Sequence, residues 1–197
     1  MKKAPGAKRC AWCNEKNARY VAYHDEEWGR PVHDDGRLYE LLILEAFQAG
    51  LSWECVLNKR ENFRRALDGF DPVRVATYGE EKIAALLADT GIIRNKRKIT
   101  ATIENSRVFL AIAAEYGSFD RYIWSFTEGQ TVYEPYTLRT TSPLSDRVSQ
   151  DLVRRGMRFV GSTVVYSYLQ AVGIISGHAC DCFCYVPPPK TDGTARE

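Results

Sequence analysis

Four side chains suited to binding a metal ion lie near the two ends of the sequence. Cys10 and His24 come early in the chain, and His178 and Cys182 come late. Two thiolates and two imidazoles are a suitable set for a closed tetrahedral zinc site, which leaves no coordination position open for an activating water. A zinc ion held in this way is structural, and it ties the two ends of the chain together across a very long loop.

The cysteines also allow other interpretations. Cys10 and Cys13 form a CxxC pair, which together with Cys180, Cys182 and Cys184 could make an all-thiolate site or a redox pair. Unliganded buried thiols are a third interpretation. Structural disulfides are not expected, because we expect the chain in the reducing cytoplasm. The residues alone leave these alternatives open.

One carboxylate is predicted to lie inside the protein. Glu45 shares a helical face with Leu38, Leu41, Leu42 and Ala49, so burial of that apolar face carries the carboxylate into a poorly hydrated place. A buried acidic group needs a partner. A salt bridge or a hydrogen bond at a helix end is the more common role of such a residue, and a bound ligand is the alternative.

Aromatic residues gather near this carboxylate in the sequence. They crowd the N-terminal segment and follow the helix that carries Glu45: Trp12, Tyr20, Tyr23, Trp28 and Trp53. Aromatic faces combined with a carboxylate suit a flat, cationic guest, because stacking and cation–π attraction add to hydrogen bonds with an exocyclic amine. An alkylated purine fits this description. The same rings can form an ordinary core, and this is the interpretation we adopt for Trp28 and Trp124.

A basic helical hairpin is predicted over residues 84–98. We expect Gly91 to adopt the left-handed turn between the two helices, since it alone does so there without steric cost. The turn amides and the start of the second helix can then face a phosphate oxygen. Four cations add attraction that does not depend on nucleotide sequence: Arg94, Lys96, Arg97 and Lys98. Considered by itself, this segment fits better with an ordinary helical hairpin whose charged residues form a solvent-exposed face and do not bind DNA.

The elements that position these groups are predicted to be helices. Apolar residues recur at helical spacing, and Gly, Pro and Asp separate the segments. We expect helices over residues 37–49, 59–67, 80–88, 95–114, 119–126 and 145–155, and a short one opened by Asp71 and Pro72. Residues 162–166 have the composition of a strand, but their spacing predicts a helix that ends at Gly173. The fold class expected is all-α.

The composition is that of an ordinary globular protein. The chain has 197 residues, of which 45% are hydrophobic, and a formal net charge of +2. We expect one domain over residues 1–197, with an ordered core over about 10–185 and loose tails at 1–9 and 186–197. No apolar run suits a membrane span or a signal segment, so we expect a cytoplasmic monomer without a membrane partner. The small net charge does not by itself identify a nucleic-acid-binding protein.

Six blocks of sequence between Cys10 and Tyr185 match one known family in order. They are Cys10-x-Trp12, Tyr20-x-x-Tyr23-His24-Asp25-x-Glu27-Trp28-Gly29, Leu44-Glu45-x-x-Gln48-Ala49-Gly50-Leu51-Ser52-Trp53, Gly91-Ile92-Ile93-Arg94, Phe159-Val160-Gly161 and His178-x-x-x-Cys182. Together these blocks resemble the bacterial 3-methyladenine DNA glycosylase I family. The resemblance is far more specific than any single motif above.

The resemblance implies a helix-hairpin-helix DNA glycosylase fold and a structural Zn²⁺ site that joins the N- and C-terminal segments. It favours one ligand set over the CxxC pair: Cys10, His24, His178 and Cys182. It also implies a base pocket lined by Trp12, Tyr20, Tyr23, Glu45 and Trp53. In that pocket Glu45 accepts hydrogen bonds from the adenine edge, and Leu51 is the apolar wedge that fills the gap left in the base stack.

The activity that the resemblance implies is base excision repair by a monofunctional glycosylase. The enzyme hydrolyses the N-glycosidic bond of 3-methyladenine in double-stranded alkylated DNA and releases the free base. The hairpin residues contact the DNA: Gly91, Arg94, Lys96, Arg97 and Lys98. No catalytic aspartate or lysine nucleophile is identified by motif, since Asp120 follows the hairpin in surroundings that do not match. We expect water to attack the sugar, with no lyase step.

Two rival functions remain at this point. A damaged-DNA-binding protein without catalytic activity could use the same scaffold, because a pocket can bind a base without releasing it. A cytosolic zinc or thiol redox module could be centred on Cys10 and Cys13. Base release from methylated DNA distinguishes the first rival, and the effect of removing Cys13 distinguishes the second.

Overall fold

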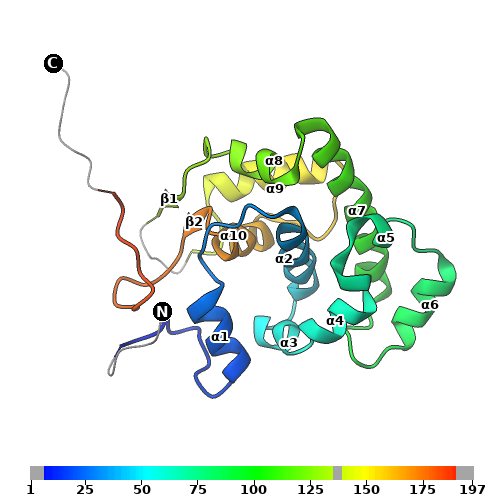
Figure 1. Cartoon of the computed structure of the whole chain (residues 1–197), viewed down its shortest axis with the longest axis horizontal. Helices are drawn as coiled ribbons and strands as arrows, with labels where there is room; N and C mark the ends of the chain where they lie inside the picture. The colour runs from blue at the N-terminus through cyan, green and yellow to red at the C-terminus, as the bar shows by residue number, and fades with distance from the viewer. Residues whose placement is uncertain (1–6, 135–138, 190–197) are drawn as a thin grey trace.

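Helices make up most of the computed structural model, which describes residues 7–134 and 139–189 (Figure 1). In chain order they are α1 (Ala18–Glu26), α2 (Asp35–Gln48), α3 (Trp53–Asn58), α4 (Arg60–Ala66), the 3-10 turn η1 (Asp68–Phe70), α5 (Pro72–Val75), α6 (Glu80–Ala88), α7 (Lys96–Tyr116), α8 (Phe119–Ser125), α9 (Pro143–Arg154) and α10 (Ser162–Ala171). Two short strands, β1 (Val132–Tyr133) and β2 (Ile175–Ser176), pair in parallel. The predicted helical fold is confirmed, and this strand pair is a small addition to it.

Local capping explains where the predicted helices begin. Asp34 accepts a hydrogen bond from the Arg37 amide at 2.8 Å, and Asn95 accepts one from the Lys98 amide at 3.1 Å, so these side chains satisfy amides that lack a partner within the helix. Asp71 caps α5 directly before Pro72. The segment with strand-like composition forms α10, as its spacing predicts. Helices α1 and α3 are not among the predicted elements.

Helix α2 lies at the centre of the molecule. It packs against α10, α3, α7 and α8, and every residue from Leu38 to Phe47 is buried. A helix that is buried on all sides is normally apolar all round. Glu40 and Glu45 break that rule, so the packing of α2 takes two carboxylates into the interior.

The two ends of the described chain meet on one side of the molecule (Figure 1). Lys8 and Cys182 form an isolated parallel bridge, and the Phe183 amide donates to the Lys8 carbonyl at 3.0 Å. Arg9 donates two hydrogen bonds of 2.7 Å to the carboxylate of Asp25. Lys8 and Arg9 are therefore held in the fold, which corrects their assignment to a loose tail. Residues 1–6 and 190–197 of the expected tails lie outside the described part.

The connection between α6 and α7 differs from the predicted turn. Gly91 does not have a positive φ, so the predicted left-handed conformation is wrong. A Cβ at this position would lie 2.9 Å from Oδ1 of Asp89 and 3.1 Å from Nδ2 of Asn62, so close packing requires the glycine. The Gly91 amide donates to Asp89, and its carbonyl accepts from Asn62 at 2.9 Å. The turn is thus fastened to α4, and this amide is not available to a phosphate.

Lys98 does not belong to the exposed basic cluster in which the sequence analysis placed it. Its side chain is buried, and Nζ donates to the carbonyls of Phe47 and Ala49 at 2.7 and 2.6 Å. These carbonyls belong to the last turn of α2, where a cation also interacts favourably with the helix dipole. Lys98 therefore fastens the end of α2 to the start of α7.

No helix in the described part of the chain is long and apolar enough to cross a membrane.

Replacing Lys98 tests this contact. We expect Lys98→Met to lower the free energy of unfolding by about 1–3 kcal/mol, because two buried carbonyls lose a charged donor. Lys96→Met, at an exposed position two residues earlier, should change it by less than about 0.5 kcal/mol. Urea denaturation of both variants at neutral pH measures the difference. Equal stability of the two variants would contradict the role given to Lys98.

Candidate active site

A cavity of about 240 Å³ opens between α1, α2, α3 and α10. Nine residues line it: Trp12, Tyr20, Tyr23, Trp28, Glu45, Gln48, Trp53, Ser167 and Gln170. All five residues that the sequence analysis placed in a base pocket are among them. The cavity combines aromatic walls with one carboxylate, the combination expected for a flat, cationic ligand.

Helices whose local cause is clear provide much of the cavity wall. Tyr20 and Tyr23 are three residues apart on α1, so they share one face of that helix. Trp53 is the first residue of α3, which is capped by the Ser52 hydroxyl. Glu45 projects from the buried helix α2.

Glu45 lines the cavity together with the aromatic residues, and its carboxyl group is buried without an ion-pair partner in the described chain. The residue is 3% exposed, and Oε2 has no hydrogen-bond partner within the described chain. Burial raises the pKa of its carboxyl group to about 8. An adjacent positive charge would lower this pKa again, because it stabilises the ionised form. The environment therefore favours a cationic partner at Glu45.

Two further buried polar atoms in the cavity also have no hydrogen-bond partner among the residues that the structure describes. They are the hydroxyl of Tyr23 and the indole Nε1 of Trp53, whose rings lie 5.2 Å apart. A buried polar group without a partner costs about 1–3 kcal/mol. With Glu45, these atoms offer a donor, an acceptor and a hydroxyl to a ligand that carries complementary groups.

Four residues of the cavity were not predicted from the sequence. Gln48 is three residues after Glu45 on α2, and Ser167 and Gln170 are three residues apart on α10, so each pair shares a helical face. Polar residues at this spacing on otherwise apolar helices are the signal that could have identified them. Trp28 is 8% exposed and lines the cavity, so its assignment to the core alone is corrected.

Trp124 keeps the role predicted for it. The residue is buried, and its Nε1 donates to the Val32 carbonyl at 2.9 Å. It does not line the cavity between α1 and α10.

A glycine beside the cavity allows two of its walls to approach each other. A Cβ on Gly177 would lie 2.7 Å from Cη2 of Trp28 and 2.7 Å from Nε2 of Gln170. A larger residue here would displace one of these two side chains, both of which line the cavity. Gly177 thus fixes the width available to a ligand between α10 and the segment after α1.

A second cluster lies where the two ends of the chain meet. The potential ligand atoms of Cys10, His24, His178 and Cys182 lie within 4.8 Å of one another, and all four residues are buried. Nδ1 of His178 is 3.5 Å from each of the two thiol sulfurs, and Nε2 of His24 is 3.4 Å from the Cys182 sulfur. This cluster can hold a metal ion.

Hydrogen bonds orient both imidazoles of this cluster. Nδ1 of His24 donates to Asp25 at 2.8 Å, and Nε2 of His178 donates to the Trp28 carbonyl at 3.2 Å. The other nitrogen of each ring therefore faces the thiols, as metal-binding histidines require. Burial lowers the pKa of His178 to about 4 and also lowers the pKa of His24. Both shifts favour the neutral imidazole that a metal ion requires.

The CxxC interpretation finds no support in this geometry. Cys13 lies outside both groups of potential metal ligands found in the described residues, and its thiol faces the Tyr20 carbonyl at 3.8 Å. Cys180 is exposed. Cys184 lies with His24 and Asp25 in the second group of potential ligands, and its amide donates to the Cys182 sulfur at 3.4 Å.

The Cys/His cluster and the cavity share a wall of aromatic rings. Trp12 contacts His24, with ring centroids 5.1 Å apart, and Trp28 contacts His178, with centroids 4.7 Å apart. The rings of Trp12 and Trp28 meet edge to face at 4.8 Å. Both tryptophans line the cavity, so the position of its wall depends on the order of the cluster behind it.

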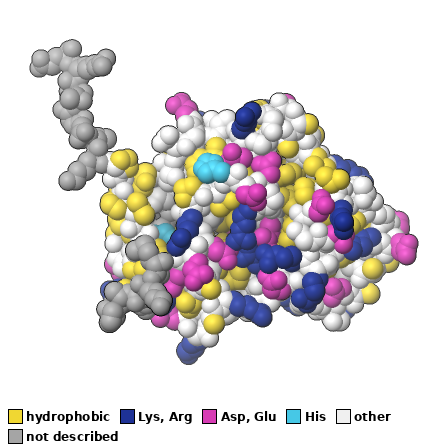
Figure 2. All heavy atoms as spheres, viewed as in Figure 1, with side chains coloured by type: hydrophobic (Ala, Val, Ile, Leu, Met, Phe, Trp, Pro, Cys, Tyr) yellow, Lys and Arg dark blue, Asp and Glu magenta, His cyan; other side chains and the backbone are white. Residues whose placement is uncertain are grey.

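An ion-pair network braces the helices on the other side of the cavity. Arg60 on α4 donates to Glu40 on α2 and to Glu27 after α1, each at 2.8 Å. Arg37 pairs with the same two carboxylates, and Arg64 adds a third contact to Glu40. Figure 2 shows basic and acidic side chains interspersed over this face. The network joins α4 to α2, which carries Glu45, and to the end of α1, which carries Tyr23.

Comparison with known proteins matches this arrangement to one family. A profile described as methyladenine glycosylase matches residues 12–185. The chain is 44% identical to DNA-3-methyladenine glycosylase 1 of Escherichia coli (strain K12), over 90% of this chain and 96% of that protein. The chain belongs to the methyladenine glycosylase family.

Solved structures of the methyladenine glycosylase family share the fold. A crystal structure of 3-methyladenine DNA glycosylase I is 43% identical with a TM-score of 0.87, covering 91% of this chain and 100% of that one. A second is a tyrosine-to-phenylalanine variant in complex with 3-methyladenine, 32% identical with a TM-score of 0.84, covering 88% of this chain and 95% of that one. The resemblance noted from the sequence motifs is thus confirmed.

The remaining predicted residues lie outside the cavity lining and differ in exposure. Leu51 is 42% exposed and follows Gly50, whose φ of +77° turns the chain away from the end of α2. Arg94, Lys96 and Arg97 are exposed, whereas Lys98 is not. Asp120 does not line the cavity, and its carboxylate binds Nδ1 of His33 at 2.8 Å.

The raised pKa of Glu45 predicts how stability depends on pH. Because the pKa is about 8 in the folded state against an ordinary value of 4.5, the folded protein holds this proton more tightly than the unfolded chain. The associated stability is present below pH 4.5 and is lost as the pH rises through 8. Glu45→Gln removes this loss, so its stability relative to wild type should rise from pH 5 to pH 8 and then level off.

Denaturation of the ligand-free protein at several pH values between about 5 and 9 measures this difference. Glu81→Gln, at an exposed position of α6, is the matched control, and its difference from wild type should stay constant. A difference for Glu45→Gln that does not vary with pH would contradict the buried carboxyl group described above.

Proposed function

We propose that this protein is a monofunctional DNA glycosylase that hydrolyses the N-glycosidic bond of 3-methyladenine in alkylated double-stranded DNA. The observation that carries the proposal is the aromatic cavity around the unpartnered carboxylate of Glu45. The curated relative from Escherichia coli is named a DNA-3-methyladenine glycosylase, and one similar structure is a complex with 3-methyladenine. The protein then acts in base excision repair.

In this proposal five residues bind the damaged base. Trp12, Tyr20, Tyr23 and Trp53 provide aromatic contacts to the purine, and Glu45 accepts hydrogen bonds from its exocyclic amine. The unpartnered atoms of Tyr23, Glu45 and Trp53 support this assignment, because a base edge would satisfy them. Methylation at N3 gives the purine in DNA a positive charge, which Glu45 and the rings stabilise.

The chemical step follows from that charge. The bond between C1′ of the sugar and N9 of the purine breaks, and its electron pair stays on the purine, which leaves as a neutral base. A water oxygen then bonds to C1′ and loses a proton to solvent. A base that departs neutral needs little help from a general acid, so the proposed cavity contributes recognition and electrostatic stabilisation.

The damaged nucleotide must leave the base stack before it can enter the cavity. Extrusion costs a few kcal/mol, and less for a base that pairs badly. We assign to Leu51 the role of an apolar wedge in the vacated space, since it is exposed beside the cavity residues Gln48 and Trp53. Apolar side chains of this kind can insert between base steps of a duplex.

The DNA backbone is proposed to lie along a helix-hairpin-helix element made of α6, α7 and the connection that contains Gly91. Arg94, Lys96 and Arg97 are exposed and can approach phosphates. Lys98 is left out of the proposed interface because its ammonium group binds carbonyls of α2. Gly91 contributes by holding the connection against α4.

The Cys/His cluster is proposed to bind one structural Zn²⁺. Zinc bonds of about 2.3 Å to sulfur and 2.0–2.1 Å to nitrogen in a tetrahedron place sulfur and nitrogen ligands about 3.5 Å apart. The sulfur-nitrogen separations of 3.4–3.5 Å in the cluster fit this value. Four protein ligands leave no open position for water, so the ion would stabilise the joined ends of the chain. We further propose that residues 1–197 form one glycosylase domain that acts as a monomer.

Base release tests the proposed activity. Methylated duplex DNA incubated with the protein should release 3-methyladenine, identified by chromatography, and should leave abasic sites that break only after alkali treatment. Strand scission without alkali, or release of undamaged adenine, would contradict a monofunctional enzyme for this lesion. Binding without any release would favour the damaged-DNA-binding protein instead.

Glu45→Gln tests the proposed base contact. The variant should bind free 3-methyladenine more weakly while it unfolds cooperatively like wild type, because only the acidic acceptor changes. Glu54→Gln, which lies on α3 outside the cavity lining, is the matched control and should keep wild-type affinity for the base. Isothermal calorimetry measures both. If Glu45→Gln binds free 3-methyladenine with wild-type affinity, the proposed contact with the base is wrong and Glu45 has a structural role.

Zinc content in wild type and in a ligand variant tests the proposed zinc site. Purified protein should contain about one zinc ion per chain. Cys182→Ser should lower that content and reduce both thermal stability and affinity for free 3-methyladenine, because Trp12 and Trp28 pack on the cluster histidines. Cys180→Ser, at an exposed position outside the cluster, should change none of these quantities. Full zinc content in Cys182→Ser would contradict the ligand set.

A further inference from the structure

Tyr23 is shared by two cavities of the described chain. It lines the cavity that contains Glu45, and it also lines a second cavity of about 180 Å³ together with Arg60. Arg60 does not line the first cavity, and Glu45 does not line the second. Tyr23 is therefore the side chain through which Arg60 can act on the proposed base site.

Arg60 keeps one donor that its ion pairs do not use. Nε donates to Glu40 and Nη1 donates to Glu27, each at 2.8 Å, so two contacts fix the plane of the guanidinium group. The remaining nitrogen, Nη2, is buried and has no hydrogen-bond partner among the described residues. The residue as a whole is 7% exposed. A donor in this position is costly unless an acceptor, such as a water molecule in the second cavity, lies within its reach.

The Tyr23 hydroxyl is also buried without a partner. The residue is 2% exposed, and no group in the described part of the chain forms a hydrogen bond with its oxygen. Burial raises the pKa of this hydroxyl, Glu45 raises the pKa further, and Arg60 lowers it. The hydroxyl therefore keeps its proton at neutral pH, and the charges of Glu45 and Arg60 both act on it.

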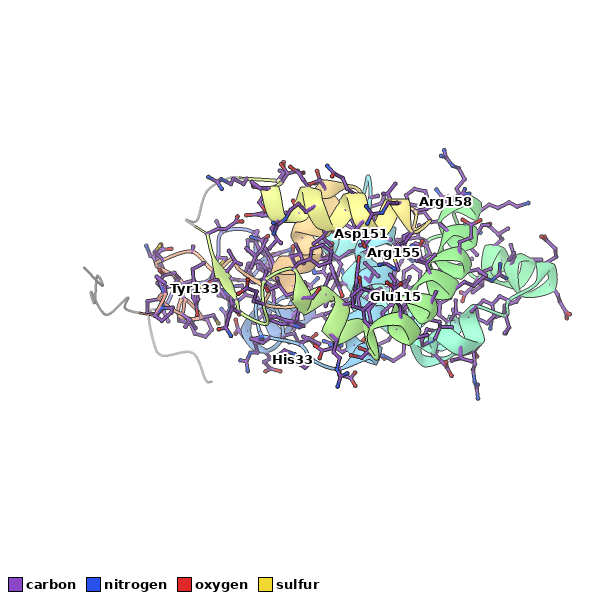
Figure 3. The ribbon with its side chains drawn as sticks, turned by 90° about the horizontal axis from the view of Figure 1, so that it is seen from above. His33, Glu115, Tyr133, Asp151, Arg155 and Arg158 are labelled. Atoms are coloured by element: carbon purple, nitrogen blue, oxygen red, sulfur yellow. The ribbon has the colours of Figure 1, made fainter. Side chains whose placement is uncertain are left out.

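Another tyrosine of this protein shows the alternative arrangement. Tyr122 donates its proton to Asp151 at 2.8 Å, and Arg155 pairs with the same carboxylate. Figure 3 shows Arg155 between Asp151 and Glu115. There a carboxylate of the protein accepts the tyrosine proton, whereas no carboxylate of the described chain does so for Tyr23. The Tyr23 proton is thus available to a ligand.

We propose that Arg60 is a positioning residue that fixes the direction of the Tyr23 hydroxyl in the base site. A guanidinium group donates hydrogen bonds and does not accept them. Through a water molecule in the second cavity, which is large enough for one, Arg60 supplies a donor to the Tyr23 oxygen. The Tyr23 proton is then directed into the base cavity.

A fixed donor near Glu45 complements the edge of the proposed base. In 3-methyladenine a ring nitrogen with a free lone pair lies on each side of the exocyclic amine. Glu45 accepts from the amine, and Tyr23 donates to one of these nitrogens. The inference rests on the proposed function, because it requires that the damaged base occupies the cavity.

A double-mutant cycle tests the role of Arg60. Arg60→Lys keeps a positive charge for Glu40 and Glu27 but lacks the planar group that holds Nη2 in one direction. It should weaken the binding of free 3-methyladenine by about 2- to 10-fold, the effect of one hydrogen bond. The same change in a Tyr23→Phe background should have no further effect, because the hydroxyl is already absent. Isothermal calorimetry measures all four proteins.

Two further variants control for changes in packing. Arg64→Lys is the matched control, because Arg64 also belongs to α4 and donates to Glu40 at 2.6 Å, yet lines neither cavity. It should keep wild-type affinity for the base. If Arg60→Lys does not unfold cooperatively, Arg60→Gln combined with Glu40→Gln takes its place in the cycle, since it leaves neither member of that buried pair charged.

The outcomes separate this inference from the proposed function. Equal losses of affinity with and without the Tyr23 hydroxyl would show that Arg60 acts by packing alone, and the inference would be wrong. Wild-type affinity in Arg60→Lys would also refute it, while release of 3-methyladenine from methylated DNA by the wild-type protein would still support the glycosylase. If the wild-type protein neither binds nor releases 3-methyladenine, both proposals fail.

Discussion

An acidic side chain inside a helix that is covered on all sides is the constraint on which the site depends. Packing of α10, α3, α7 and α8 around α2 removes water from Glu45, and the surrounding helices supply no ion-pair partner to its Oε2. The same burial raises the pKa of the carboxyl group to about 8, because water no longer stabilises the charge. The fold thus maintains an unsatisfied group at the place where a cationic ligand can satisfy it.

Two separate devices hold the walls around that group. On one side, the Cys/His cluster lies behind Trp12 and Trp28 and joins segments from opposite ends of the chain. On the other side, Arg60 joins the end of α1, α2 and α4 through two carboxylates. The charged residues of the cluster and of the ion-pair network do not line the cavity. The walls are therefore held in place without giving Glu45 a permanent ion-pair partner. This arrangement leaves the Glu45 carboxylate available to a ligand.

Much of the fold and the site could be predicted from local patterns. The caps at Asp34, Asp71 and Asn95 and the helical spacing of apolar residues located most of the helices, since these signals act within a few residues. The motif resemblance identified the five aromatic and acidic residues that the structure brings together. Lys98 and Gly91 were misread for one shared reason: their contacts are to Phe47, Ala49 and Asn62, which are distant in sequence.

The amino-acid sequence by itself determined the helical class, the buried face that contains Glu45 and the residue types that could bind a metal or a flat ring. Periodicity and capping are properties of neighbouring residues, so they can be read without the fold. The tertiary structure alone decided that Lys98 points inward and that Trp28 is both core and cavity wall. It also brings Cys10 to Cys182, where the residue types by themselves left several ligand sets open. These outcomes depend on which elements pack together, and packing joins residues whose separation along the chain carries no signal of their contact.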